Sequence, residues 1–203
     1  MDPRLFAAFV SFSFVSGITP GPNNLIALAS GANYGYRRTL PHVFGVVLGF
    51  NVVYLLMGAG LGTLFTAFPL AKEILKWGCL LYILFLAWKI ASAAGPGNAH
   101  ENGPTGKPVS FFGSVGFQWI NAKVWVATLT LLSTYTDPEA YWTSLFAGSL
   151  ANAVIAFGSV SVWTLFGTLL KRFLEHPLRR RVFNIVMALI LVASVVPSIF
   201  KTT

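Results

Sequence analysis

The stretch Gly17-Ile18-Thr19-Pro20-Gly21-Pro22-Asn23-Asn24 lies inside a long apolar segment near the start of the chain. No charged residue occurs between Leu5 and Tyr36, and this segment is longer than the apolar core of a cleavable signal peptide. It is also long enough to cross a bilayer as a helix. Two prolines within three residues remove backbone donors and break the helical ladder. The stretch therefore predicts a membrane-spanning helix that stays in the mature protein and is interrupted near its middle.

The interruption suits either a binding site or a kink. Backbone carbonyls without partners are tolerated in a membrane only against protein or a water-filled cavity. Pro22 can restart a helix whose N-terminal amides attract a carboxylate, and Asn23 and Asn24 add donors and acceptors suited to a zwitterion. Discontinuous helices mark the substrate sites of many transporters. From these residues alone, a substrate site formed by Pro20–Asn24 and a packed structural kink both stay open.

The composition is that of a membrane protein with a single domain. Of the 203 residues, 55% are hydrophobic and 10% are charged, against about 25% charged in soluble domains. A soluble protein this apolar would expose more hydrophobic surface than water tolerates. The net charge of +8 is typical of basic loops that set membrane orientation, and the sequence does not indicate binding to nucleic acid. We expect one transmembrane domain over residues 1–203, in contact with lipid.

Apolar runs predict an all-α, polytopic membrane protein with six spanning helices. A short turn with Arg37 and Arg38 follows the first span, and a basic loop that includes Arg179–Arg181 precedes the last. The clearest loop, 95–108, separates a first half (1–94) from a second half (109–203). Because each half has three spans, the halves would be inverted repeats. The expected spans lie near residues 5–30, 40–65, 70–94, 110–135, 140–170 and 182–200.

Lysines and arginines are divided unevenly between the two sides of this topology. The side that holds the loop 95–108 carries nine of them, and the opposite side carries four. Short loops rich in these residues face the cytoplasm, so the loop 95–108 is expected to be cytoplasmic. Both termini then face outward.

The fourth expected span contains a cation, Lys123, close to Gln118 and Asn121. If Lys123 marked a loop, each flanking piece would have about 14 residues and neither would span a bilayer. We therefore expect one continuous helix with a buried lysine, and two re-entrant halves are the alternative. An intramembrane cation normally faces a cavity or a partner. Lys123 would bind a substrate carboxylate or change its protonation, unless it snorkels from a shorter span.

Asn51 in the second span and Asn152 in the fifth follow glycines at similar positions. Each alone is explained by an interhelical hydrogen bond, worth about 0.6 kcal/mol. Their matched placement in the two halves makes both of them candidates for the same substrate site, together with Gln118, Asn121 and Lys123.

The residues disfavour several other classes of membrane protein. No Asp or Glu lies within an expected span, whereas cation sites and proton relays usually need carboxylates or carbonyls. Ser16 and His42 lack the nucleophile–base arrangement of an intramembrane protease. The single cysteine, Cys79, cannot form an internal disulfide. We expect no enzymatic activity, no metal and no cofactor.

Several motifs together resemble the LysE/RhtB family of amino-acid exporters. The resemblance covers nearly the whole chain and is greatest to the cysteine and O-acetylserine exporter branch. Ala122 stands where many members have proline, so the resemblance predicts no proline break in the fourth span. The motifs are Gly17–Asn24 followed by Gly35-Tyr36-Arg37-Arg38, Ala87-Trp88-Lys89-Ile90 at the end of the third span, and Gln118-Trp119-Ile120-Asn121-Ala122-Lys123 in the fourth.

The resemblance implies a secondary transporter in the inner membrane of a bacterium. It would export small neutral amino acids or derivatives from the cytoplasm by alternating access, coupled to protons in antiport. Export of another solute (homoserine, threonine, a basic amino acid or a cation) and a non-transport membrane scaffold are the alternatives. The expected partners are a zwitterionic amino acid and protons, and glycine-rich helix faces would allow a homodimer.

Overall fold

A computed structural model describes residues 2–61, 69–92 and 107–200 of the chain. Every regular element in these ranges is helical, which confirms the all-α prediction. The elements are α1 (Pro3–Ile18), α2 (Pro22–Tyr34), α3 (Tyr36–Leu56), the π-helix η1 (Met57–Leu61), α5 (Pro69–Ala91), α6 (Phe111–Ile120), α7 (Ala122–Tyr135), α8 (Tyr141–Leu170), the 3-10 helix η3 (Phe173–Glu175) and α9 (Pro177–Phe200).

The first apolar segment is interrupted where the prolines predict it. α1 ends at Ile18 and α2 starts at Pro22, and the two helices are bent by 52° relative to each other. Between them Thr19 (φ −61°, ψ 135°) and Gly21 (φ −166°, ψ 177°) are extended, as residues before proline prefer to be. The predicted break is confirmed.

The fourth apolar segment is also interrupted, and here the expectation of one continuous helix is wrong. α6 ends at Ile120 and α7 begins at Ala122, with Asn121 extended between them (φ −82°, ψ 103°). The break needs no proline because the Asn121 side chain accepts a hydrogen bond from the Lys123 amide at 3.1 Å. This bond caps the N-terminus of α7.

Two basic clusters lie in helices rather than in the predicted turn and loop. Gly35 alone separates α2 from α3, with a φ of 82° that glycine adopts without strain, so Arg37 and Arg38 belong to the first turn of α3. α9 begins at Pro177 and includes Arg179–Arg181, because proline at the first position favours a helix start. Of the predicted loop 95–108, all but residues 107 and 108 lies outside the described part of the chain.

Two of the described helical segments are long and apolar enough to cross a bilayer by themselves. They are Tyr36–Gly60, with 25 residues, and Tyr141–Leu170, with 30. The bent pair α1–α2 passes the same test as one broken span. Many large apolar side chains on these helices are exposed, for example Leu150 at 71%, which is typical of a surface that faces lipid.

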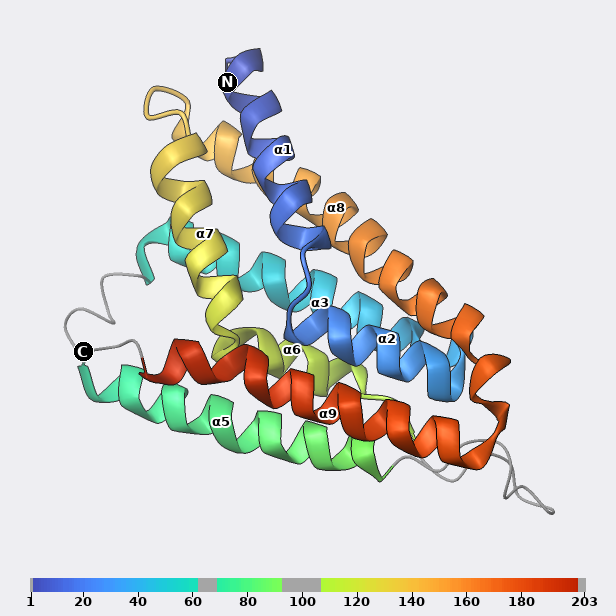
Figure 1. The fold of residues 1–203 in the computed structure, drawn as a ribbon. Helices are drawn as coiled ribbons and strands as arrows, with labels where there is room; N and C mark the ends of the chain where they lie inside the picture. Colours follow the sequence, from blue (N-terminus) through green and yellow to red (C-terminus); the bar gives the residue numbers. More distant parts are fainter. Residues whose placement is uncertain (1, 62–68, 93–106, 201–203) are drawn as a thin grey trace.

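α2 lies at the centre of the helix assembly (Figure 1), and its residues from Asn24 to Asn33 are all buried. The long helices pack across the two halves of the sequence. α8, from the second half, contacts both α1 and α2, and α3, from the first half, contacts both α6 and α7. α5 and α9 pack on each other below α2 and α6 in Figure 1. Because each long helix packs on the broken pair of the other half, the two helix breaks lie close together between α3 and α8.

Glycines allow these cross-half contacts to reach backbone distance. A Cβ on Gly31 of α2 would overlap the backbone of α8 at Thr164, and one on Gly167 of α8 would overlap the backbone of α2. A Cβ on Gly45 of α3 would lie 2.5 Å from the Phe111 carbonyl of α6. Small residues permit such close helix approach in membranes, so α2 is tied to α8 and α3 is tied to α6.

The connections between helices gather at two ends of the assembly (Figure 1). The α2–α3 turn, the end of α5 and the start of α9 lie at one end. The start of α1, the connection from α7 to α8 and the end of α9 lie toward the other end.

Candidate functional site

The carbonyls freed by the first break accept hydrogen bonds from side chains. Asn24 of α2 donates to the Gly17 carbonyl at 2.8 Å and to the Thr19 carbonyl at 3.0 Å. The indole of Trp163 on α8 donates to the Ile18 carbonyl at 3.0 Å. A buried carbonyl without a donor costs about 1–3 kcal/mol, so these bonds stabilise the interrupted conformation.

The second break uses the same means with fewer residues. Asn121 caps α7 through its side chain, as described above, and its own carbonyl accepts from the Val124 amide at 2.9 Å. The indole of Trp125 reaches back across the break and donates to the Trp119 carbonyl at 2.7 Å. In both breaks, a tryptophan therefore satisfies a carbonyl of the last helical turn before the interruption.

Two side-chain contacts join the breaks to each other. The Asn23 amide donates to Gln118 Oε1 at 2.8 Å, and the Gln118 amide donates back to Asn23 Oδ1 at 3.2 Å. The ammonium of Lys123 donates to the Thr19 carbonyl at 2.6 Å. Lys123 from the second half thus reaches the extended backbone of the first half, where a charged donor forms a stronger bond than a neutral one.

Gly21 provides the space that Lys123 occupies. A Cβ built on Gly21 would lie 2.9 Å from Lys123 Cδ and 3.1 Å from its Nζ, so the lysine stem lies directly on the glycine. The Gly21 backbone is extended, a conformation that other residues also adopt. What matters at this position is the absence of a side chain.

A cavity of about 80 Å³ lies beside the two breaks. One ordered water needs roughly 10–15 Å³ on the same measure, so the cavity has room for a small solute. In the described part of the chain no acidic side chain lines it, and Lys123 is its cation. Its lining consists of Ser13, Ser16 and Gly17 of α1, Gly21, Asn23 and Asn24 at the first break, Val46 and Phe50 of α3, Asn121, Lys123, Val124, Ala127 and Leu131 at the second break, and Asn152, Ile155, Ala156, Ser159 and Val160 of α8.

A chain of polar contacts continues from the cavity toward α3. Gln118, which pairs with Asn23, also donates to the Ser114 carbonyl at 2.8 Å. The Ser114 hydroxyl lies 2.7 Å from Nδ1 of His42, and the His42 side chain is fully buried. These contacts fix the orientation of the Gln118 amide behind the cavity wall.

The structure brings most of the predicted site residues together. Six of them line the cavity directly: Gly21, Asn23, Asn24, Asn121, Lys123 and Asn152. Pro20 and Pro22 belong to the break itself, and Gln118 stands behind Asn23. Asn51 is outside the lining; it donates to the Val47 carbonyl at 2.8 Å and accepts from the Ser149 hydroxyl at 2.8 Å, the interhelical role that was its alternative.

Three serines of the lining were missed by the sequence reasoning. Ser13 and Ser16 lie three positions apart on α1, and Ser159 lies seven positions after Asn152 on α8. Such spacings place residues on one face of a helix. A search for small polar side chains that recur at helical spacing within apolar spans would have found them.

The chain is similar to known proteins over nearly its whole length. Residues 14–196 match the family described as LysE type translocator. The chain is 37% identical over 194 residues to proteins named cysteine/O-acetylserine efflux protein from Escherichia coli strain K12 and from Shigella sonnei strain Ss046. Each alignment covers 95% of this chain and 96% of the relative. No solved structure matches the chain.

Proposed function

The chain belongs to the family of LysE type translocators, and we propose that it exports small neutral amino acids or derivatives, such as cysteine and O-acetylserine, from the bacterial cytoplasm. The observation that carries the proposal is the cavity at the two helix breaks, where one cation and several amides meet without any acidic side chain in the described lining. A zwitterion offers a carboxylate to that cation. A basic substrate would lack a counter-charge for its side chain.

Lys123 is the proposed partner of the substrate carboxylate. Its ammonium is held by the Thr19 carbonyl, a neutral acceptor that a carboxylate would outcompete because charge-assisted pairs are stronger. Asn23 and Asn121 line the same part of the cavity and can donate to the carboxylate or accept from the ammonium group. Lys123 would alternate between this role and carrying a proton, which would couple export to proton antiport.

The proposed architecture has six spans arranged as two inverted halves. Each half contains a broken helix pair followed by a long helix, α3 or α8, and then by α5 or α9. Both long helices pack on the broken pair of the other half, and this reciprocal packing supports a two-fold relation between the halves. The basic residues favour a cytoplasmic location for the α2–α3 turn, the loop 95–108 and the start of α9, with both termini outside.

Uptake into inverted membrane vesicles tests the proposal. In vesicles with an imposed proton gradient, we expect saturable uptake of labelled cysteine and O-acetylserine, weaker uptake of threonine and none of lysine. Dissipating the gradient should abolish accumulation. The absence of saturable uptake of every one of these solutes would refute the proposed function.

Replacing Lys123 tests the assignment of the carboxylate partner. Lys123→Met keeps an unbranched side chain of four heavy atoms and removes the charged end, so we expect uptake to fall about 10- to 100-fold, the equivalent of one hydrogen bond to a charged group. Lys171→Met, at the end of α8 and outside the cavity lining, is the matched control. If both variants are present in the membrane at equal amounts and transport equally, Lys123 is not the substrate's partner.

A further inference from the structure

The cavity contains polar atoms that no protein group satisfies. Within the described ranges, seven buried side-chain nitrogen and oxygen atoms have no hydrogen-bond partner. Three of them belong to residues that line the cavity: Ser13 Oγ, Asn152 Nδ2 and Ser159 Oγ. Each such atom costs about 1–3 kcal/mol when it is buried without a partner. A recurring cost at one place indicates a ligand that supplies the missing partners.

Other polar side chains on the same helices do find partners. Ser11 on α1 donates to the Ala7 carbonyl at 2.8 Å, and Thr164 on α8 donates to the Val160 carbonyl at 2.8 Å. This bond to the preceding turn is the usual solution for a hydroxyl in an apolar helix. Ser13, like Ser159, does not adopt it. The hydroxyls of Ser13 and Ser159 are therefore buried at the cavity without a hydrogen-bond partner.

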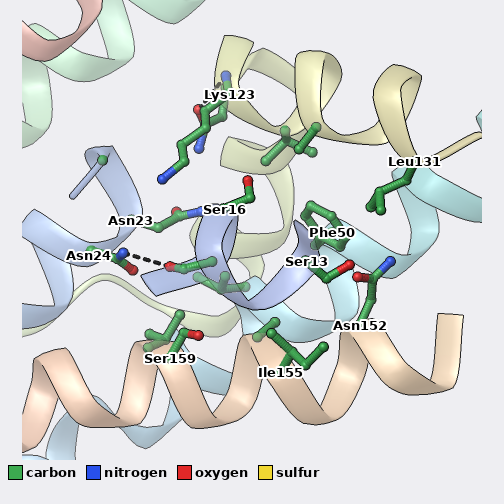
Figure 2. A pocket seen from close by; sticks show the side chains of 18 residues that line it. Ser13, Ser16, Asn23, Asn24, Phe50, Lys123, Leu131, Asn152, Ile155 and Ser159 are labelled. Atoms are coloured by element: carbon green, nitrogen blue, oxygen red, sulfur yellow. Dashed lines mark hydrogen bonds between the residues drawn. The ribbon is translucent and has the colours of Figure 1, made fainter. Parts of the chain in front are cut away.

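Ser13 and Asn152 lie at the far end of the cavity from Lys123 and Asn23 (Figure 2). α1 and α8, which carry Ser13 and Asn152, pack against each other. Both side chains are almost fully buried, at 5% and 3% exposure. The cavity thus has a charged end at the breaks and a neutral, hydrogen-bonding end between α1 and α8.

We propose that Ser13 and Asn152 form a subsite that recognises a hydrogen-bonding group on the side chain of the transported amino acid. This inference rests on the proposed function, in which Lys123 binds the substrate carboxylate and so directs the side chain toward α1 and α8. The unpartnered Asn152 atom is a donor, and the Ser13 hydroxyl can donate or accept. Together they fit a hydroxyl, a thiol or an ester carbonyl.

The physical consequence is discrimination against apolar amino acids of the same size. A solute that brings no hydrogen-bonding group leaves the buried donor and the hydroxyl unpaired, whereas a solute with such a group satisfies them. Sites of this kind reject the analogue that lacks the polar group far more strongly than a hydrophobic pocket rejects a change in size. The subsite would thereby set which neutral amino acids leave the cell.

Competition with pairs of solutes of equal size tests the subsite. In inverted vesicles that take up labelled O-acetylserine, serine is compared with 2-aminobutyrate, and unlabelled O-acetylserine with 2-amino-5-methylhexanoate. We expect the polar member of each pair to compete about 30- to 1,000-fold better. If vesicles transport O-acetylserine but the two members of each pair compete equally, the subsite is refuted and the proposed function stands. If no solute is transported, the proposed function itself fails.

Substitutions at Ser13 and Asn152 test whether these two residues cause the discrimination between polar and apolar solutes. Asn152→Leu and Ser13→Ala remove the unpartnered groups, and each should lower the polar preference at least about fivefold. Thr128→Val is the matched control, because the Thr128 hydroxyl is also buried and unpartnered but lies outside the cavity lining. If Asn152→Leu fails to accumulate in the membrane, the preference for polar solutes is measured in Ser13→Ala alone. An unchanged preference in Ser13→Ala, or an equal loss in Thr128→Val, would overturn the assignment.

Discussion

The two helix breaks interrupt their spans by different chemical means. The first has prolines at 20 and 22 and spreads over three non-helical residues, 19–21. The second has one non-helical residue, Asn121, and no proline. In the first break, prolines prevent the helix from continuing. In the second break, the Asn121 side chain caps α7, which favours two separate helices over one continuous helix. A broken span can therefore be specified by one asparagine if the surrounding helices complete its hydrogen bonds.

The comparison also shows how unequally the two breaks are supported. The carbonyls at the first break accept bonds from Asn24, Trp163 and Lys123, which come from three helices. The second break is capped by its own Asn121 and by Trp125 of the adjoining helix. The first break should withstand the loss of any single contributor better than the second.

The largest effect is expected at the amide pair that joins the breaks. Gln118→Met or Asn23→Leu leaves the other amide without its partner, so each should lower the free energy of unfolding in detergent by about 1–3 kcal/mol. The loss in the free energy of unfolding for the double variant should be smaller than the sum of the two single losses by about 1 kcal/mol. Thermal unfolding of the three variants measures this coupling.

Asn51→Leu is the control for the amide pair, because Asn51 also bonds across helices but lies outside the cavity. It should lower stability without lowering uptake per folded molecule. Strict additivity of Gln118→Met and Asn23→Leu would show that the two breaks are not joined through these amides.

A smaller effect is expected where Lys123 lies on the first break. Gly21→Ala places a methyl group 2.9 Å from Lys123 Cδ, which displaces a flexible side chain at little cost in stability. We expect uptake to fall about tenfold, as for a loss of roughly 1.4 kcal/mol in substrate binding. Gly158→Ala on α8 meets nothing within 4 Å and should transport normally. Equal transport by both variants would contradict the role of the Lys123 position.

The cap of the second break should contribute about 1 kcal/mol. Asn121→Ala removes the acceptor for the Lys123 amide, so it should lower the unfolding temperature and let α6 and α7 approach a continuous helix. Asn121→Asp keeps a side-chain oxygen at the same place and should retain most of the stability. If both substitutions cost the same, the cap does not hold this break.

The smallest effect is expected for a single proline of the first break. In Pro20→Ala the carbonyls of residues 17–19 keep their side-chain donors, so the break should persist. We expect a change below about 0.5 kcal/mol in stability and below about twofold in uptake. A loss as large as that of Asn121→Ala would mean that Pro20 is needed even when Pro22 and the tertiary hydrogen bonds are in place.

The sequence predicted what depends on local chemistry. Pro20 and Pro22 break a helix in any context, so the first break and its neighbour Asn23 were found. The limits of long spans such as Tyr141–Leu170 were also predictable, because an uninterrupted apolar run shows where the span begins and ends. The break at Asn121 was not found, because a cap succeeds only if partners such as Trp125 are in reach. The free hydroxyl of Ser13 was not predictable either, since its lack of a partner is a property of the packed helices.

The glycine crossings described above bear on how such a protein can move. Gly31 and Gly167 seat α2 and α8 backbone to backbone, and Gly45 does the same for α3 and α6, so neither pair can slide or separate without opening an unfilled gap. Each pair unites one helix from either half of the sequence. These contacts therefore oppose a rigid-body separation of the two halves. The geometry favours movement at the two helix breaks, residues 19–21 and Asn121, over a separation of the two halves.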